Sequence, residues 1–156
     1  MSPVEVFLIR HAAAVDETLE LRDPFRHLTP GGREQAKSLG DRLRWHDCLP
    51  THVWTSPLVR AVQTAELVAA GLQLPIAVDV LPTLAPGESA RAVVATLNQL
   101  PADAHVVLVG HEPGMSGIGA LLLGHDLGAL AKAEAVRISD GKLRWRFAWN
   151  AEAPDR

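Results

Sequence analysis

Arginine and histidine side chains follow three short apolar segments of the chain, where they could do chemistry together. They are Arg10 and His11 after the first segment, Arg60 after the second and His111 after the last. Two guanidinium groups can neutralise a dianionic phosphoryl group and hold it through bidentate hydrogen bonds. A neutral imidazole is a competent nucleophile near pH 7, because its unperturbed pKa is about 6.5. These residue types therefore predict a phosphate pocket that contains its own nucleophile.

The chemistry of such a pocket is phosphoryl transfer. Attack of one imidazole on phosphorus would give a phosphohistidine intermediate, and a second imidazole could stabilise charge on the equatorial oxygens. Arg60 is expected in the first turn of a helix, where the helix dipole disfavours a cation unless an anion is bound beside it. No metal and no other cofactor is required, because the two arginines supply the positive charge. Arg10 would also repel a metal cation held by His11 and His111.

The segments between these residues alternate between strand-like apolar runs and helical patterns. Strands are expected at 4–9, 53–55, 76–80 and 106–109, and the stretch 136–149 predicts a β-hairpin with its turn at Asp140-Gly141. Helices are expected over 30–46, from 57 to a stop at Gly71, over 90–100, and from 114 to a stop near Gly124. Thr29-Pro30, Ser56-Pro57 and Ser89 have the residue types of helix N-caps for the first three.

This order predicts an α/β fold: a three-layer α/β/α sandwich with a mostly parallel central sheet and a C-terminal β-hairpin at its edge. The hairpin core would hold Trp145, Phe147 and Trp149, which occupy alternate positions. Ligands of such sheets bind beyond the carboxyl ends of the strands, where the arginines and histidines emerge. We expect one domain over residues 1–150, followed by a polar C-terminal tail, 151–156.

Composition excludes several other classes of protein. The chain has 156 residues and a net charge of −3, which argues against nucleic acid as a partner, since a phosphate backbone calls for a basic face. A single cysteine, Cys48, excludes an internal disulfide and a multi-cysteine zinc site. The sequence shows no signal-peptide pattern and no apolar stretch of membrane-spanning length, so no membrane partner is expected. These features predict a cytoplasmic protein.

Three sequence blocks resemble the signatures of the histidine phosphatase (phosphoglycerate mutase-like) superfamily. They are Phe7-Leu8-Ile9-Arg10-His11, the run from Ser56 to Ala65 with Arg60 at its centre, and Val109-Gly110-His111-Glu112-Pro113. The short chain, Ala12-Ala13-Ala14 after His11, and the segment from Asp23 to Gly32 are similar to its small SixA-type phosphohistidine phosphatase branch. The resemblance implies that His11 is the phosphorylated nucleophile and that Arg10, Arg60 and His111 complete the phosphate pocket. It also implies a contact of Arg26 with the substrate at the rim.

At one position the chain departs from this family. Many members carry a general-acid glutamate after the third strand, and Thr83 occupies that position here. Glu88 or Asp16 could replace it, and the sequence leaves both open. An alkyl phosphate must expel an alkoxide, which needs a proton, whereas phosphohistidine can expel a neutral imidazole. The loss therefore favours a phosphoramidate or another activated phosphate as substrate.

The sequence thus predicts a phosphatase that works through a phosphohistidine intermediate on His11 and removes phosphate from protein phosphohistidine. Its partner would be a phosphorylated protein. Two alternatives remain at this level: a broad small-molecule phosphomonoesterase, which would take a small phosphorylated substrate, and a catalytically weak phosphoprotein-binding module. Turnover of phosphohistidine against binding without release would separate the enzyme from the module.

Overall fold

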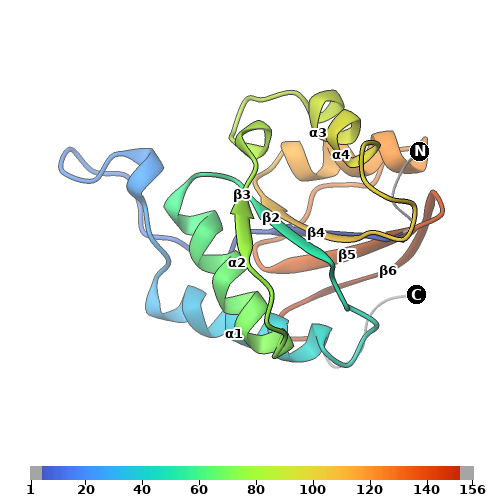
Figure 1. Cartoon of the computed structure of the whole chain (residues 1–156). Helices are drawn as coiled ribbons and strands as arrows, with labels where there is room; N and C mark the ends of the chain where they lie inside the picture. Colours follow the sequence, from blue (N-terminus) through green and yellow to red (C-terminus); the bar gives the residue numbers. More distant parts are fainter. Residues whose placement is uncertain (1–4, 152–156) are drawn as a thin grey trace.

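A computed structural model describes residues 5–151, and its centre is a six-stranded sheet with the order β3-β2-β4-β1-β5-β6 (Figure 1). The strands are β1 (Glu5–Arg10), β2 (His52–Thr55), β3 (Val78–Val80), β4 (His105–Gly110), β5 (Glu134–Ser139) and β6 (Lys142–Ala148). Strands β1 to β4 are mutually parallel, and β5 is antiparallel to both of its neighbours, β1 and β6. The carboxyl ends of the four parallel strands therefore meet at one edge of the sheet, as the sequence predicts.

Helices cover both faces of this sheet. One face packs against α1 (Pro30–Leu43) and α2 (Val59–Leu72), and the other against α3 (Ala90–Leu97) and α4 (Gly114–Leu123) (Figure 1). Short 3₁₀ helices, η1 (Asp23–Phe25) and η2 (Pro82–Leu84), lie in the connections after β1 and β3. The three-layer α/β/α sandwich is therefore confirmed. No helix among residues 5–151 is long and apolar enough to cross a membrane.

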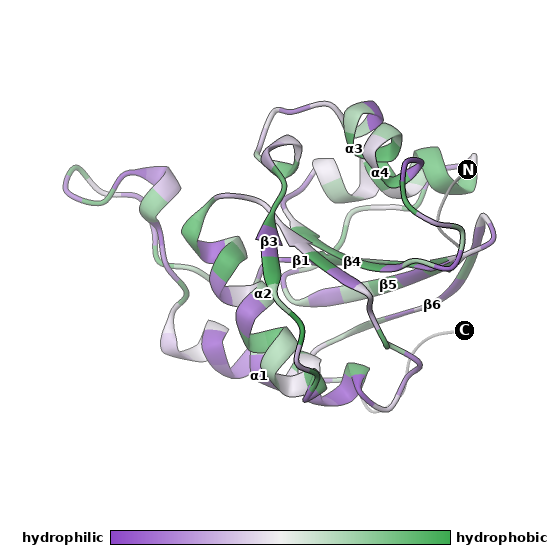
Figure 2. Cartoon of the chain, viewed as in Figure 1, coloured by the Kyte–Doolittle hydropathy of each residue, from purple (hydrophilic) through white to green (hydrophobic). Residues whose placement is uncertain are grey.

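The two central strands explain why their sequences are continuously apolar. Along β1 and β4, alternate side chains enter opposite cores, one with Phe7 and Val107 beneath α1 and α2, the other with Leu8 and Leu108 beneath α3 and α4. All four of these side chains are fully buried. A parallel strand covered on both faces needs apolar residues at every position. Figure 2 shows this concentration of apolar residues in the central strands.

The predicted N-caps of α1 and α3 and the predicted C-terminal stop of α4 are confirmed, but the signals predicted for α2 are not. The side chains of Thr29 and Ser89 accept hydrogen bonds from the backbone N–H groups of the first turns of α1 and α3. Gly124 ends α4 with a φ of 79°. Ser56, in contrast, is not a cap, because α2 begins only at Val59. Its side chain is engaged elsewhere, as described below.

The predicted stop of α2 at Gly71 is wrong, since the helix continues to Leu72. Gly71 instead lies against Gly40 of α1, where a Cβ atom on Gly71 would come within 2.8 Å of the Gly40 carbonyl carbon. The missing side chain therefore permits close contact of two helices rather than ending one. Helix α1 is shorter than expected and ends at Leu43, and β3 begins at Val78 rather than 76.

The C-terminal hairpin forms as predicted, with β6 at the sheet edge. Trp145 and Phe147 are 1% and 3% exposed and their tilted rings lie 4.8 Å apart between centroids, which confirms these two members of the expected aromatic core. Trp149 follows β6 and is only partly buried against that core. Leu143 falls outside it and is 42% exposed, because a register shift opposite Arg137 and Ile138 breaks the alternation. Of the predicted tail 151–156, only Ala151 lies within the described residues. Of the predicted first strand 4–9, Val4 lies outside them.

Candidate active site

The predicted site residues meet at the carboxyl edge of the sheet. Strands β1 and β4 pair in a register that sets Arg10 opposite Gly110, so the next residues, His11 and His111, emerge side by side. The backbone N–H of His11 donates to the Gly110 carbonyl at 3.0 Å. The two imidazole rings lie 5.1 Å apart between centroids, and each residue is 6% exposed. Parallel pairing of two distant segments thus creates a buried histidine pair.

The hydrogen bond of His11 determines which ring nitrogen is available. Its Nδ1 lies 2.7 Å from the carbonyl oxygen of Ala12. A carbonyl only accepts, so Nδ1 carries the proton and donates, and Nε2 keeps its lone pair. Burial first, and then the positive charges of Arg60 and Arg10, lower the pKa of His11 to about 4, against the opposing effect of the Ala12 hydrogen bond. The imidazole is therefore neutral and nucleophilic near neutral pH.

The second histidine is also neutral. Burial lowers the pKa of His111 to about 3, with further contributions from His11 and Arg60. Its Nε2 lies 2.7 Å from the hydroxyl oxygen of Ser56, which is itself fully buried. Sequence analysis did not single out this contact, because the local pattern Ser56-Pro57 is typical of a helix cap.

Arg60 is buried in the first turn of α2, and a carboxylate from the loop after β1 compensates its charge. Its Nη1 donates to the backbone carbonyl of Asp23 at 2.9 Å, and its Nη2 lies 3.5 Å from the Asp23 carboxylate. Arg26 donates to the same carboxylate at 2.9 Å. These arginines, Arg26 before Arg60, hold the pKa of Asp23 below its usual value. Asp23 is thus the carboxylate that pairs with Arg60 in the folded chain, and no local signal distinguishes it from the other acidic residues of the loop.

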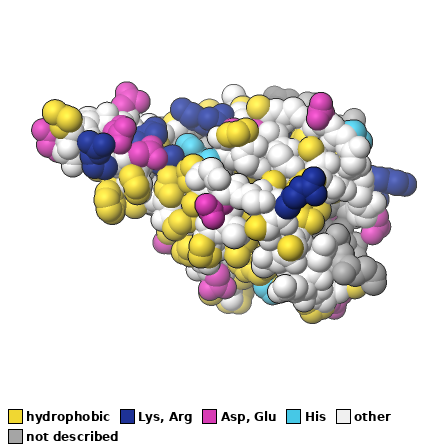
Figure 3. All heavy atoms as spheres, turned by 90° about the horizontal axis from the view of Figure 1, so that it is seen from above, with side chains coloured by type: hydrophobic (Ala, Val, Ile, Leu, Met, Phe, Trp, Pro, Cys, Tyr) yellow, Lys and Arg dark blue, Asp and Glu magenta, His cyan; other side chains and the backbone are white. Residues whose placement is uncertain are grey.

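The loop that carries Asp23, residues 15–27, projects from the body of the protein (Figure 1). An antiparallel bridge between Ala14 and Leu28 closes its base. Figure 3 views this edge of the molecule from above and shows histidine side chains at the base of the loop, flanked by arginine or lysine side chains. Arg26 donates through Nε to the Val15 carbonyl at 2.6 Å, so it braces the loop from within. Asp16, one candidate acid, lies on this loop and is exposed.

Several buried nitrogen atoms of these residues lack a hydrogen-bond partner within the described part of the chain. They are Nε of Arg10, Nε of Arg60 and Nδ1 of His111. Arg10 also donates through Nη1 to the Leu130 carbonyl at 3.1 Å, which fixes its guanidinium. Buried donors without partners are costly in a protein unless a ligand satisfies them. An anion bound at this edge of the sheet would give these three nitrogens a partner.

A threonine that the sequence analysis did not identify joins the first strand end to α2. The hydroxyl of Thr64 donates to the Arg60 carbonyl at 2.8 Å and accepts the backbone N–H of Ala12 at 3.1 Å. Gly32 of α1 lies directly on the same segment, where a Cβ atom would come within 2.0 Å of the Ala13 carbonyl oxygen. These contacts fix the backbone immediately after His11.

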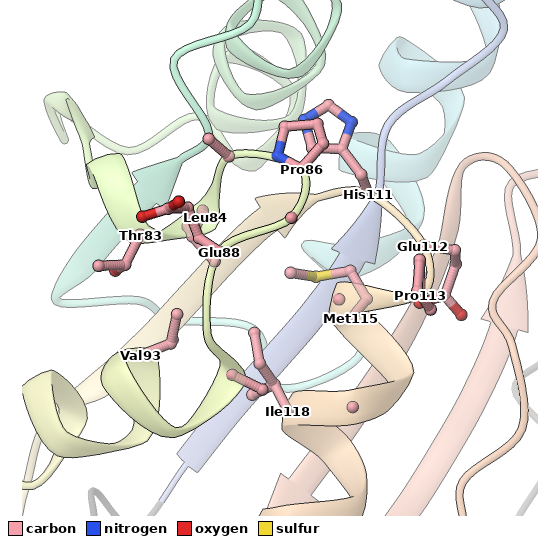
Figure 4. Close-up of a pocket in the computed structure, with 15 residues that line it drawn as sticks. Thr83, Leu84, Pro86, Glu88, Val93, His111, Glu112, Pro113, Met115 and Ile118 are labelled. Carbon is pink, nitrogen blue, oxygen red and sulfur yellow. The ribbon is translucent and has the colours of Figure 1, made fainter.

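A cavity of about 310 Å³ adjoins His111 on the side of α3 and α4 (Figure 4). Thr83 and Glu88 line it, and Glu88 is exposed. The hydroxyl oxygen of Thr83 is buried and has no hydrogen-bond partner among residues 5–151. Glu112 is occupied as an anchor, since its carboxylate accepts from the backbone N–H groups of Ser116 at 2.7 Å and Leu130 at 2.6 Å. Within that same range, no cluster of three or more His, Cys, Asp or Glu side chains could hold a metal ion.

Comparisons with known proteins agree with this geometry. The model of the histidine phosphatase superfamily (branch 1) matches residues 6–85. An uncharacterized protein of Picosynechococcus sp. is 35% identical over 147 residues, covering 90% of this chain and 88% of that one. The phosphohistidine phosphatase SixA of Escherichia coli is 34% identical over 113 residues, covering 70% and 68% of the two chains. A structure of the protein histidine phosphatase SixA complexed with tungstate superimposes with a TM-score of 0.84 at 27% identity, covering 93% and 97%.

Proposed function

Since the chain belongs to the histidine phosphatase superfamily, in its SixA-type branch, and is a phosphatase-type hydrolase, we propose that it removes phosphate from protein phosphohistidine. The observation that carries the proposal is the neutral His11 imidazole, whose Nε2 keeps its lone pair beside the positive charges of Arg60, which is buried, and Arg10, which is half-buried. The E. coli relative carries the same activity in its name.

The reaction proceeds in two transfers. Nε2 of His11 attacks phosphorus, and the bond from phosphorus to the leaving nitrogen breaks. The substrate ring carries a proton on its other nitrogen, so it leaves as neutral imidazole, and the phosphoryl group stays on His11. Water then attacks the same phosphorus, the bond to His11 breaks, and inorganic phosphate departs. Arg10, Arg60 and the donor on His111 neutralise the equatorial oxygens in both steps. The positive charge of the two arginines replaces the metal ions that many phosphoryl-transfer enzymes use.

The composition of the cavity supports phosphohistidine as the substrate class. Thr83 lines the cavity at the position where many family members carry the general-acid glutamate, and its hydroxyl cannot act as a carboxylic acid. An imidazole leaving group has a conjugate-acid pKa of about 6.5, so it departs with far less help from an acid than an alkoxide. Glu88, exposed at the cavity, and Asp16, exposed on the projecting loop, are the carboxylates that an alkyl phosphate would have to use.

The cavity also favours one second candidate, a phosphatase of small molecules. A volume of about 310 Å³ next to His111 can hold the leaving group of a small phosphate ester. This candidate uses the same nucleophile and differs only in the leaving group, so the substrates themselves must decide between the two.

The test is phosphate release from a phosphohistidine peptide, a phosphoserine peptide and an aryl phosphate, each with the wild type and His11→Ala. We expect release from phosphohistidine and its loss by a factor of at least about 10³ in the variant, because the covalent route disappears. Release from the aryl phosphate alone would keep His11 as the nucleophile and identify a small-molecule phosphatase. Tight phosphohistidine binding without release from any substrate would replace the enzyme with a binding module.

A further inference from the structure

Ser56 occupies an unusual position for a serine, at the carboxyl end of β2 and completely buried beside the catalytic histidine pair. Its backbone N–H donates to the Val109 carbonyl at 2.9 Å, which continues the pairing of β2 with β4. Its hydroxyl oxygen accepts the backbone N–H of Leu58 at 3.2 Å and lies 2.7 Å from Nε2 of His111. The backbone and the side chain of Ser56 are therefore both fixed against the strand that carries His111.

The remaining question is which partner donates in the contact between Ser56 and His111. If Nε2 of His111 carried the proton, the Ser56 oxygen would accept twice, and its own proton would have no acceptor within residues 5–151. A fully buried hydroxyl proton without an acceptor is costly. If Ser56 donates instead, its proton and its lone pair both have partners. Nε2 of His111 is then the acceptor, and the proton of the neutral ring is on Nδ1.

We propose that Ser56 is a positioning residue that fixes the tautomer of His111, so that an N–H donor at Nδ1 rather than a lone pair faces the phosphoryl group. Nδ1 is buried and has no hydrogen-bond partner in the described part of the chain, so its N–H is the ring donor that lacks an acceptor. The role rests on the proposed function, because the donor is useful only where an anionic oxygen binds beside His11.

The two histidines then have the same tautomer but present opposite chemistry. His11 donates through Nδ1 to the Ala12 carbonyl and presents the lone pair of Nε2, which can attack phosphorus. His111 accepts at Nε2 from Ser56 and presents the N–H of Nδ1, which can stabilise an oxygen that gains negative charge. A backbone carbonyl thus fixes the tautomer of the nucleophile, His11, and a buried hydroxyl fixes the tautomer of the hydrogen-bond donor, His111.

The first test reads the tautomer directly in the protein without substrate. Long-range proton–nitrogen NMR spectra at neutral pH would be recorded for the wild type and Ser56→Ala, with His111→Asn used to assign the ring. We expect Nδ1 of His111 to be protonated in the wild type, and the ring of Ser56→Ala to become a mixture of tautomers. A wild-type ring protonated at Nε2 would overturn the proposal, whatever activity the protein has.

The second test measures kinetics with an aryl phosphate. Ser56→Ala is expected to lower kcat by about 10- to 100-fold, the usual loss for a residue that orients a catalytic group, while KM changes much less. Ser56→Thr keeps the hydroxyl and should recover most of the rate. Ser38→Ala is the matched control, since Ser38 donates a hydrogen bond to the Trp149 carbonyl far along the chain from the site and should leave kcat unchanged.

The outcomes separate this inference from the proposed function. Equal kcat values for the wild type and Ser56→Ala, in a variant with an unchanged urea midpoint, would overturn the role of Ser56 while the phosphatase remains. Absence of turnover on every substrate, together with a His111 ring protonated at Nδ1, would overturn the proposed function and support the contact with Ser56. A low kcat in Ser56→Thr as well as Ser56→Ala, with both urea midpoints unchanged, would count against the hydroxyl as the active feature.

Discussion

Two walls of the candidate site differ in how tightly they are built. The phosphate wall, which we propose holds the phosphoryl group, consists of Arg10, His11, Arg60 and His111. Each side chain is held by a hydrogen bond, that of His11 to the neighbouring Ala12 carbonyl and the others to distant parts of the chain. The leaving-group wall consists of residues 83–88, in which the Thr83 hydroxyl has no partner within the described residues and Glu88 is exposed. Figure 4 shows Thr83 and Glu88 across the cavity from Glu112 and Pro113.

The difference follows from the charges that each wall carries. A guanidinium or imidazole in the interior needs at least one fixed partner, because a group left wholly unpaired there is destabilising. The three nitrogens of this wall that lack a partner belong to side chains fixed through another atom. The residues 83–88 contain no buried charge, so little constrains which side chain stands there. The proposed phosphate wall should therefore tolerate substitution poorly, while residues 83–88 should tolerate it with little loss of stability. The three predictions below test that distinction.

Removal of charge from the phosphate wall should have the largest effect. Arg60→Ala is expected to lower kcat/KM by about 10²–10⁴-fold, the range for loss of a cation that stabilises a phosphoryl transition state. Because Asp23 keeps its bond with Arg26, the variant should still fold. Steady-state kinetics on a phosphohistidine peptide would measure the loss, together with the urea midpoint.

The control for this prediction is Arg33→Ala, which removes an exposed arginine from α1. Arg33→Ala should change kcat/KM by less than about twofold, in line with surface substitutions that touch no partner. Comparable losses in the two variants would mean that net charge, rather than the position of Arg60, supports the reaction. The phosphate wall would then be no more specialised than the rest of the surface.

The contrast between the walls also explains what could be predicted from the sequence. Apolar runs of strand length predict a parallel sheet, and parallel strands bring their carboxyl ends to one edge. Arg10, His11, Arg60 and His111 each follow such a run, so the sequence alone brings them together. The replacement of the family's general-acid glutamate by Thr83 could also be recognised from the sequence, because it depends on the position in the chain and not on a tertiary contact.

The contacts that hold the phosphate wall could not be predicted. Ser56 lies 55 positions from His111, and Asp23 lies 37 positions from Arg60. In each case the local pattern indicates something else: a helix cap at Ser56-Pro57, and an acidic surface loop around Asp23. Gly71 is a third example, where a residue type that ends helices instead permits close packing on Gly40. Such roles depend on tertiary partners that local patterns do not encode.

A second prediction concerns stability at acid pH, where the phosphate wall should be the weak point. The folded pKa is about 4 for His11 and about 3 for His111, whereas both groups titrate near about 6.5 in the unfolded chain. Below that value the unfolded chain binds more protons than the folded one, so stability falls as pH falls. At about pH 5 the loss should be on the order of 1–2 kcal/mol for each histidine.

Urea unfolding near pH 7 and near pH 5 would measure this loss, with the double variant His11→Asn, His111→Asn as the reference. Asparagine does not titrate, so the midpoint of the double variant should fall less between the two pH values than that of the wild type. Parallel falls in the two proteins would show that the buried histidines are not the source of the acid sensitivity.

The smallest expected effect is on the leaving-group wall, and its sign is opposite. Thr83→Glu places a carboxylic acid beside the cavity, where it can protonate an alkoxide leaving group. We expect kcat/KM for an alkyl phosphate to rise by about tenfold, less than the 10²–10⁴-fold of a fully positioned acid, because no existing contact orients the new side chain. The rate on a phosphohistidine peptide should stay within about threefold, since imidazole departs without that proton.

Thr83→Gln is the matched control for this change, since glutamine has nearly the shape of glutamate but cannot donate a proton as an acid. A gain with Thr83→Glu that is absent with Thr83→Gln would assign the effect to acid catalysis rather than to a reshaped cavity. Equal behaviour of the two variants on alkyl phosphates would mean that the alkoxide already obtains its proton elsewhere, with Glu88 the nearest carboxylate on this wall. The preference for phosphohistidine would then have to come from binding of the substrate protein, and the contrast between the two walls would no longer explain it.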